Sequence, residues 1–148
     1  QFLPSSYRKY AIDFDGDGRR NLNDVADSIG SVANYLQAFG WRPGEPVVIP
    51  AETGDSEIDT MLAAGIKPGI RVGELRRRGV VPLAPVSDEA ETALFSVETE
   101  AGLRYWLGLR NFYVITRYNR SINYAMAVHA LASGLRALMK QSGETVQE

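Results

Sequence analysis

Apolar residues recur at three- and four-residue steps in two stretches of the chain, and this spacing predicts two long helices. The first helix is expected over residues 24–39, where Gly40 and Pro43 follow as stop signals. The second is expected over residues 121–140. The apolar side of the first is formed by Val25, Ile29, Val32, Ala33 and Leu36, and that of the second by Ile122, Ala125, Met126, His129, Leu131, Leu135 and Leu138.

Outside these two stretches, the sequence predicts a polar loop and only short helices and strands. Residues 4–10 predict a short helix with a serine cap, and a polar, glycine-rich loop follows over residues 13–23. Prolines then break the chain, so we expect only short elements: helices at 58–64 and 72–78, and strands at 47–49, 92–98, 103–107 and 112–116. These elements predict an α+β chain in three segments: a helical part over 1–41, a small β-rich lobe over 42–111, and a helical return over 112–148.

Composition narrows the possible functions. The chain has 148 residues, of which 45% are apolar, and a net charge of -2, which does not suit a nucleic-acid-binding surface. It has no cysteine, which excludes disulfides, a thiol nucleophile and cysteine-based zinc sites. The start at Gln1 resembles neither a translation start nor a signal peptide, so we expect further residues upstream.

The run DFDGDG over residues 13–18 is the most specific short motif. Aspartates at alternate positions can turn toward one centre, and they supply the hard oxygen ligands that calcium prefers. Gly18 stands at the sixth loop position, where an EF-hand needs a sharp turn, and Arg19 would contribute its backbone carbonyl. The twelfth position holds Asp24 instead of glutamate, and either Asp24 or Asp27 could close the site. The alternative is a solvated acidic turn that caps the next helix.

Three blocks around this loop resemble the lytic murein transglycosylase B family, glycoside hydrolase family 103. They are QFLPSSY at 1–7, DSIGSVANY at 27–35 and ITRYNRSINYAMAV at 115–128. The resemblance implies a lysozyme-like helical core, of which this chain would hold a part, with an EF-hand-like calcium loop and a small inserted, mainly β lobe. It also implies a structural calcium ion whose ligands are Asp13, Asp15, Asp17, Arg19 and Asp27.

The resemblance further implies a reaction. The family cleaves the β-1,4 bond between N-acetylmuramic acid and N-acetylglucosamine without water, and the muramoyl C6 hydroxyl closes a 1,6-anhydro ring. One glutamate acts as general acid and then as base, which requires an apolar setting. The family's motif for that residue, Glu-Ser-x-Phe/Tyr-Gly, is absent, and the ten glutamates lie in polar contexts. We therefore expect no catalytic residue in this chain and the acid upstream of Gln1.

The resemblance also assigns substrate-groove residues. Aromatic faces stack on sugars and amides bind N-acetyl groups, which suits the matched positions Gln1, Phe2, Tyr35, Tyr118, Asn119 and Tyr124. Structural alternatives exist: Phe2 and Tyr35 as core aromatics, and Asn119 as a helix cap. His129, the only histidine, is interpreted as a packed residue, and the run Arg76 to Arg78 as a solvated charge cluster.

The expected partners are peptidoglycan glycan strands and the remainder of the same enzyme, with no nucleic acid. The expected location is the periplasm, with an outer-membrane lipid anchor in a missing N-terminus as one form. Two other functions compete with a transglycosylase. One is a calcium-stabilised, non-catalytic peptidoglycan-binding module. The other is a calcium-sensing EF-hand protein, which the single loop disfavours.

Overall fold

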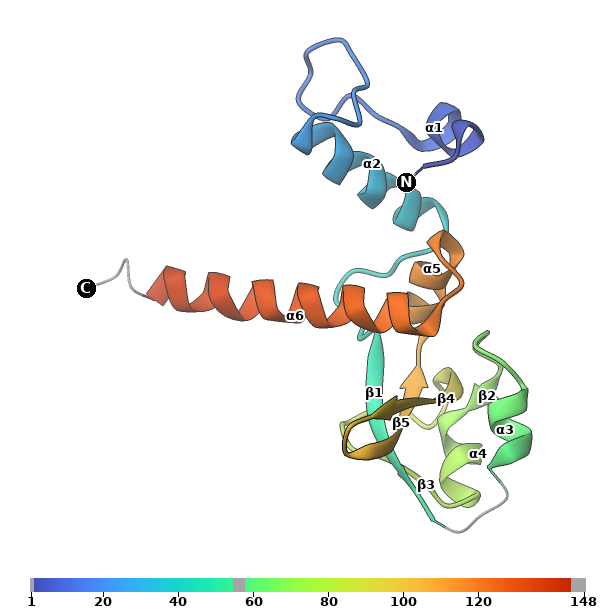
Figure 1. The fold of residues 1–148 in the computed structure, drawn as a ribbon. Coiled ribbons are helices and arrows are strands. Elements are labelled where there is room, and N and C mark those ends of the chain that lie inside the picture. Colours follow the sequence, from blue (N-terminus) through green and yellow to red (C-terminus); the bar gives the residue numbers. More distant parts are fainter. Residues whose placement is uncertain (1, 55–57, 145–148) are drawn as a thin grey trace. The chain divides into compact units, whose positions relative to one another are not determined.

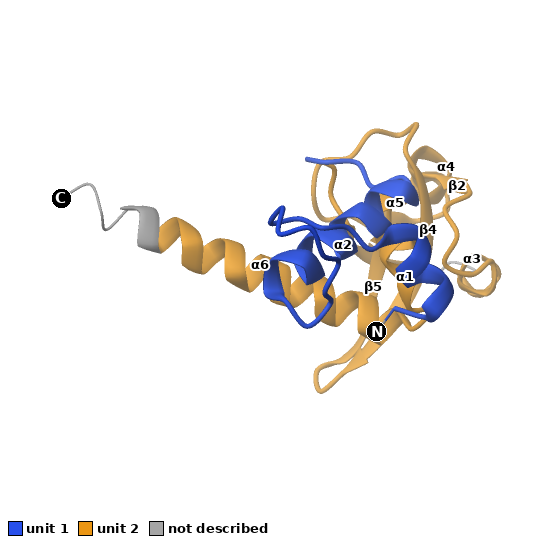
Figure 2. Ribbon diagram, turned by 90° about the horizontal axis from the view of Figure 1, so that it is seen from above, with its two compact units in different colours: residues 1–44 blue, residues 45–148 orange. Residues whose placement is uncertain are grey.

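The computed structural model describes residues 2–54 and 58–144, and the chain divides into two compact units, residues 1–44 and 45–148 (Figure 2). Helices and strands both occur, as the sequence predicts (Figure 1). Across the described ranges, no helix is both long and apolar enough to cross a membrane. Each unit is described by itself below.

The first unit holds helices α1 (Pro4–Tyr10) and α2 (Val25–Ala38), joined by the acidic loop. Helix α1 forms where it was expected, but the predicted serine cap is wrong. Leu3 is the N-cap, no side chain caps the helix, and Pro4 begins it. Proline suits that position because its fixed φ is already helical and it lacks the N–H that would be left without a partner.

Helix α2 also forms as expected, with Asp24 as its N-cap, but its apolar stripe is not the side that is buried. Val25 and Ile29 are 71% and 64% exposed, whereas Ser31 and Tyr35 are buried. The buried side of α2 is partly polar because it binds the acidic loop. Its Ser31 hydroxyl accepts a hydrogen bond from the Ile12 N–H, at 3.0 Å. The spacing of apolar residues therefore does not by itself identify the buried face of this helix.

The second unit contains a five-stranded antiparallel sheet in the order β2-β4-β5-β1-β3. Strands β4 and β5 form a long hairpin, with Leu94 opposite Leu107 and Phe95 opposite Trp106. The predicted strands at 92–98 and 103–107 are confirmed, and the strand predicted at 47–49 begins one residue later and runs longer. The strands are β1 (Val48–Thr53), β2 (Ile70–Arg71), β3 (Val80–Pro82), β4 (Glu91–Thr99) and β5 (Gly102–Gly108).

One face of this sheet is covered by the short helices α3 (Asp59–Ala63) and α4 (Val72–Arg77), both close to their predicted positions. Met61 of α3 and Leu75 of α4 pack with Leu94 and Leu107 of the sheet. All four side chains are at most 2% exposed, so this cluster forms the hydrophobic core of the unit.

The strand predicted over residues 112–116 is wrong, because this segment lies in helix α5 (Arg110–Tyr118). Its aromatic and β-branched residues favour a strand locally, but tertiary packing decides otherwise. Phe112 stacks on Phe95 of the sheet at a centroid distance of 4.5 Å. The Asn111 side chain donates a hydrogen bond to the Glu45 carbonyl at 2.9 Å. Five of the nine residues of α5 are buried, so this short helix is anchored along most of its length.

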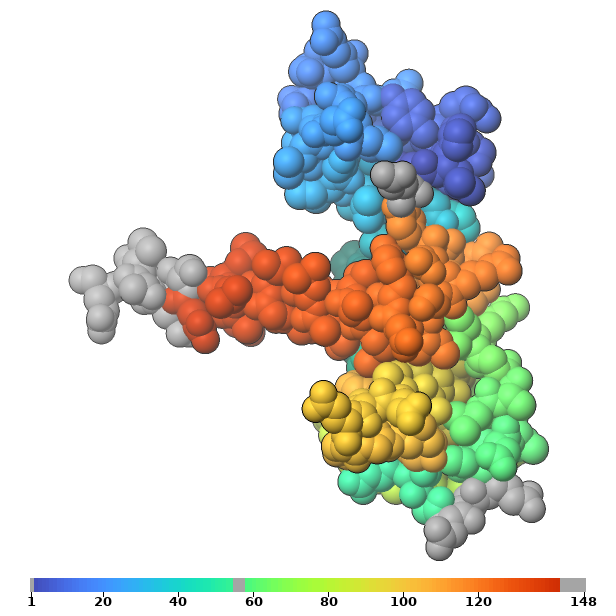
Figure 3. Space-filling model, viewed as in Figure 1, coloured from blue at the N-terminus to red at the C-terminus, as the bar shows by residue number. Residues whose placement is uncertain are grey.

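The long helix α6 (Ile122–Glu144) confirms the prediction for residues 121–140. Its first part packs in the unit, where Ala125 is fully buried. From Ala130 to Gln141 every residue is exposed, and α6 extends clear of the sheet (Figures 1 and 3). The apolar side expected from the spacing is thus only partly buried, since Leu131, Leu135 and Leu138 are 53–66% exposed.

Candidate functional site

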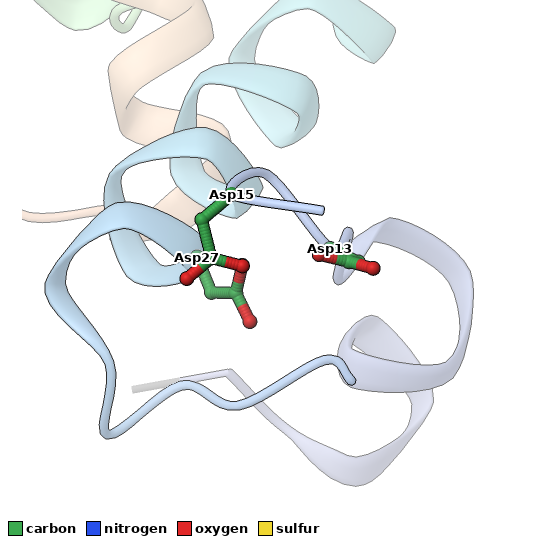
Figure 4. A group of neighbouring side chains, drawn as sticks. All are labelled: Asp13, Asp15 and Asp27. Atoms are coloured by element: carbon green, nitrogen blue, oxygen red, sulfur yellow. The ribbon is translucent and has the colours of Figure 1, made fainter. Parts of the chain in front are cut away.

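The acidic loop brings three of the predicted metal ligands together. Carboxylate oxygens of Asp13, Asp15 and Asp27 all lie within 4.8 Å of one another (Figure 4). Asp13 and Asp15 come from the loop, and Asp27 comes from the first turn of α2. Gly16 and Gly18 have φ values of +80° and +86°, which favour glycine and let the loop turn back on itself. Three hard oxygen donors in one place suit a calcium ion.

The loop is organised by its own backbone. Asp13 accepts hydrogen bonds from the N–H groups of Gly16 at 2.7 Å and Gly18 at 2.8 Å. Asp17 accepts one from the Arg19 N–H at 2.7 Å instead of joining the three-carboxylate group. Both Asp17 and Arg19 are exposed. The structure therefore positions the predicted ligand Asp13 through the same turn that Gly18 makes possible.

Asp24 and Asp27, the two residues that could close the site, have different positions. Asp24 accepts hydrogen bonds from the N–H groups of Ala26 and Asp27, at 2.8 and 3.2 Å, so it caps α2. Asp27 is 1% exposed, and its two oxygens accept from the N–H groups of Phe14 and Asn21, both at 2.7 Å. Asp27 thus joins the two ends of the loop and lies beside Asp13 and Asp15.

The pKa values of Asp27 and Asp15 in the loop are shifted in opposite directions. The N–H donors of Asn21 and Phe14 lower the pKa of the Asp27 carboxyl below its usual range. The Asp17 N–H acts in the same direction on Asp15. There, however, desolvation and the neighbouring carboxylates of Asp17, Asp27 and Asp24 outweigh it, so the pKa of Asp15 is raised. Such mutual repulsion is what a bound cation would relieve.

Two further contacts hold the loop against the helices, and neither is indicated by a clear pattern in the sequence. The Tyr7 hydroxyl of α1 donates to the Arg20 carbonyl at 2.5 Å. The Phe14 ring lies against α2 at Gly30, where an added Cβ would be 2.5 Å from the Phe14 ring. Gly30 is therefore required by the close approach of Phe14.

Phe2 and Tyr35, two of the predicted groove residues, meet in an aromatic cluster of the first unit. Their ring centroids are 5.8 Å apart, and Tyr35 also contacts Tyr10 at 5.0 Å and Phe39 at 4.6 Å. Tyr35 is only 7% exposed, as a core aromatic would be, whereas Phe2 is partly exposed. The predicted residue Gln1 lies outside the described residues.

The other predicted groove residues meet where α5 ends and α6 begins. Tyr118 and Tyr124 stack at a centroid distance of 6.3 Å with an interplanar angle of 20°. Desolvation, followed by the proximity of Tyr124, raises the pKa of the Tyr118 hydroxyl. Asn119, which lies between these two tyrosines in the sequence, is exposed. A flat aromatic surface next to an amide is chemically suited to an N-acetylated sugar.

The Asn119 amide has a defined orientation. Its Oδ1 accepts a hydrogen bond from the Ser121 N–H at 3.0 Å, so its Nδ2 donors face away from that bond. The N-cap of α6 is Ser121, whose hydroxyl accepts from the Tyr124 N–H at 3.2 Å and whose carbonyl accepts from the Ala125 N–H. Sequence reasoning missed Ser121, although a serine directly before an apolar helix is a recognised start signal.

The arginine run Arg76 to Arg78 and the single histidine His129, which were not assigned to a site from the sequence, have ordinary structural surroundings. Arg76 pairs with Asp88 at 2.9 Å and Arg78 with Glu74 at 2.7 Å, so most of the arginine run is neutralised by ion pairs. His129 is partly buried on α6. Burial, and then the positive charge of Arg136, lower the pKa of its imidazole.

Comparison with known proteins identifies the class. The transglycosylase SLT domain family matches residues 1–133, so this chain belongs to that family. The membrane-bound lytic murein transglycosylase B of Escherichia coli strain K12 is 44% identical over 135 residues, which cover 91% of this chain and 36% of that protein.

Solved structures agree. Soluble lytic transglycosylase SltB1 from Pseudomonas aeruginosa matches with a TM-score of 0.86 and 47% identity over 95% of this chain and 46% of its own. The Escherichia coli lytic transglycosylase Slt35 in complex with calcium gives 0.77 and 41%, covering 93% and 43%. SltB3 from Pseudomonas aeruginosa in complex with NAG-anhNAM-pentapeptide gives 0.77 and 32%, covering 92% and 37%. The chain thus spans less than half the length of these relatives.

Proposed function

We propose that the protein to which this chain belongs is a peptidoglycan lytic transglycosylase. It would cleave the β-1,4 bond between N-acetylmuramic acid and N-acetylglucosamine and form the 1,6-anhydro product. The observation that carries this proposal is the 44% identity, over 91% of the chain, to a lytic murein transglycosylase. We also propose that this chain forms part of a lysozyme-like core and carries an EF-hand-like loop and an inserted β lobe.

In this proposal the chain supplies binding surfaces and the general acid lies outside it. A glutamate that holds its proton near neutral pH needs an apolar setting. Among the glutamates whose side chains are described, none is buried, and Glu74, the least exposed, pairs with Arg78. This supports placing the acid upstream of Gln1. The substrate's own C6 hydroxyl acts as nucleophile, so the reaction requires no second carboxylate.

The α5–α6 junction is the proposed sugar-binding element of the second unit. Asn119 offers amide N–H donors because its oxygen is already bonded to the Ser121 N–H. These donors suit the carbonyl oxygen of an N-acetyl group. The stacked pair Tyr118 and Tyr124 offers the flat surface that a sugar ring prefers. Phe2, Tyr35 and Gln1 are the proposed groove residues of the first unit.

The acidic loop is the proposed calcium site, with a structural role. Asp13, Asp15, Asp17 and Asp27 would bind through carboxylates and Arg19 through its carbonyl. The convergence of three carboxylates and the raised pKa of Asp15 support this. The ion would neutralise the mutual repulsion of these groups and fix the loop against α2. No step of the reaction passes through it.

The expected partners and location follow from the same proposal. The partners are peptidoglycan glycan strands and the remainder of the enzyme, and the location is the periplasm, with or without a lipid anchor. The test is an anhydro-product assay on purified peptidoglycan sacculi with the full-length protein. Mass spectrometry should detect 1,6-anhydromuropeptides. Products with a free reducing end would instead indicate hydrolysis and would contradict the proposed reaction.

A second function is a calcium-stabilised peptidoglycan-binding module without activity. The described glutamates favour it, since none of their side chains has the buried setting of a general acid. The same assay separates the two functions. A full-length protein that binds sacculi in a pull-down but releases no soluble product would be the non-catalytic module.

A further inference from the structure

Three side chains of helix α2 bind the backbone of the segment that runs beside it, residues 10–14. The bonded pairs are Asp27 with the Phe14 N–H at 2.7 Å, Ser31 with the Ile12 N–H at 3.0 Å, and Asn34 with the Tyr10 carbonyl at 2.9 Å. Steps of four and three residues keep the three side chains on one side of α2, and their partners are every second residue of the segment. These three bonded pairs form the α2 ladder.

The α2 ladder joins the two candidate sites of the first unit. At one end, Asp27 is one of the three converging carboxylates, and Asp13, another of them, lies within the bonded segment. At the other end, the Tyr10 ring packs edge-on against the Tyr35 ring at a centroid distance of 5.0 Å. Tyr35 directly follows Asn34 in α2. The acidic loop and the aromatic cluster are therefore connected through one continuous set of contacts.

Much of the α2 ladder is shielded from water. Asp27 and Ser31 are at most 1% exposed, and Ala11 of the bonded segment is 4% exposed. The Ser31 hydroxyl also lies 3.5 Å from the Ile12 carbonyl, so it contacts both backbone polar groups of that residue. A buried hydrogen bond is costly to break, because water does not replace the lost partner. A displacement of the segment at the acidic loop should therefore be passed on to Tyr10.

An ion at the acidic loop would act on this segment through charge. Oxygens of Asp13, Asp15 and Asp27 lie within 4.8 Å of one another, so the ionised carboxylates repel each other when no cation lies between them (Figure 4). This repulsion pushes Asp13 and its neighbours away from α2. A bound calcium ion draws the same three carboxylates toward one centre. Calcium would therefore press the segment against α2 and support the ladder.

We propose that calcium at the acidic loop sets the position of the Tyr35 ring, and that Ser31 and Asn34 are the positioning residues that transmit its effect. This rests on the proposed function, in which the loop binds calcium and Tyr35 is a groove residue. The ion then influences glycan binding without contacting the reacting sugar. Because coupling between two binding sites is reciprocal, a weakened ladder also weakens calcium binding.

The test follows Tyr35 in the full-length protein by fluorine NMR after incorporation of fluorotyrosine. The Tyr35 resonance is the one that disappears in Tyr35→Phe. Spectra with calcium and with a chelator are compared for the wild type, Ser31→Ala and Asn34→Ala, and calorimetry gives the calcium Kd of each protein. The matched control is Ser28→Ala, which removes a hydroxyl of the same helix whose bond, to the Leu22 carbonyl at 2.6 Å, lies outside the ladder.

Calcium should shift the Tyr35 resonance of the wild type and of Ser28→Ala, whereas Ser31→Ala and Asn34→Ala should lose most of this shift. The calcium Kd of Asn34→Ala should rise about 2- to 10-fold, as expected for the loss of one hydrogen bond. Asn34 is only half-buried, so its variant keeps the test available if Ser31→Ala destabilises the unit.

Activity provides a second readout. At a temperature well below the melting transition, calcium should raise the kcat/KM of the wild type on peptidoglycan sacculi by about 2- to 10-fold. The kcat/KM of Asn34→Ala should change little with calcium, because the positioning effect no longer reaches the groove.

Four results would overturn the inference. The Tyr35 resonance could be the same with and without calcium, the shift could persist unchanged in Asn34→Ala, or Ser28→Ala could lose it to the same extent. Fourth, the kcat/KM of the wild type could be independent of calcium. Failure of the proposed function would look different, because no anhydro products would then be released with or without calcium, while the calcium-dependent shift of Tyr35 would remain.

Discussion

Asn119→Ala tests whether the α5–α6 junction binds substrate or only shapes the chain. In the structure, Asn119 accepts one hydrogen bond, from the Ser121 N–H, and the cap of α6 is Ser121 itself. Three variants separate these roles. Asn119→Ala removes both the acceptor and the donors, Asn119→Asp keeps an acceptor oxygen but removes the donors, and Ser121→Ala removes the cap alone.

The magnitudes differ enough to be distinguished. The bond to the Ser121 N–H is exposed, so its loss should cost about 0.5–1.5 kcal/mol of unfolding free energy, and loss of the Ser121 cap about 0.5–2 kcal/mol. In a protein with about 5 kcal/mol of stability, a loss of 1 kcal/mol leaves only about 0.1% of the molecules unfolded. A destabilisation of this size cannot lower turnover measurably. A missing donor to the reacting sugar should cost about 1–3 kcal/mol in the transition state, or roughly 5- to 150-fold in kcat/KM.

The measurement pairs a melting curve with an anhydro-product assay for each variant of the full-length enzyme. We expect Asn119→Ala and Asn119→Asp to lose kcat/KM by similar large factors, although the second keeps the loop bond. Ser121→Ala should lower the melting temperature while its kcat/KM stays close to that of the wild type. If Asn119→Asp were as active as the wild type, or if activity fell only with the folded fraction, Asn119 would be a structural residue and the groove assignment would be wrong.

Four further predictions concern the acidic loop and the absence of the general acid from this chain. Chelation of calcium should lower the melting temperature, since an ion at about 100 times its Kd stabilises the folded state by about 2.7 kcal/mol, and calorimetry that finds no calcium binding would refute the site. Gly30→Ala should weaken calcium binding several-fold, because the new Cβ would lie 2.5 Å from the Phe14 ring and displace the loop, and Phe14→Ala in the same chain should restore part of the affinity. The pKa of Asp27 is lower in the folded protein than in the unfolded chain, so its carboxylate stabilises the fold fully above the unfolded pKa of about 3.9. This stabilisation is lost as the pH falls through the folded pKa. With calcium chelated, the melting temperature of Asp27→Asn should therefore depend less on pH below about pH 4 than that of the wild type. The isolated 148-residue chain should release no anhydromuropeptides from sacculi, and their appearance would force a search for the acid among its ten glutamates.

Much of the fold could be predicted from local sequence patterns. Both long helices, the short helices of the second unit and the β4–β5 hairpin form at or near the predicted positions. Each combines a clear period with turn signals at its ends. The segment 112–116 was predicted wrongly because its residues have high strand propensity, while Phe112 stacks on Phe95 from a helix. Local propensity carries no information about that distant partner.

The candidate site could be predicted in type but not in detail. The alternating aspartates and Gly18 indicate a cation loop from spacing alone. The choice between Asp24 and Asp27 needed the structure, because both lie within reach of the loop along the chain. Only the folded backbone shows Asp24 bonded to the N–H groups at the start of α2 and Asp27 joining the two ends of the loop.

The sequence by itself determined which residue types are present and in what order, and that was enough to indicate the family, the acidic loop and most helices and strands. The tertiary structure decided which faces are buried and which polar groups are already bonded. It buried Ser31 and Asp27 and left Val25 and Ile29 exposed, and it gave the cap of α6 to Ser121, so that the Asn119 donors stay available. The physical reason is that burial and hydrogen-bond partners depend on residues far apart in the chain, whereas helical and strand periods depend only on near neighbours.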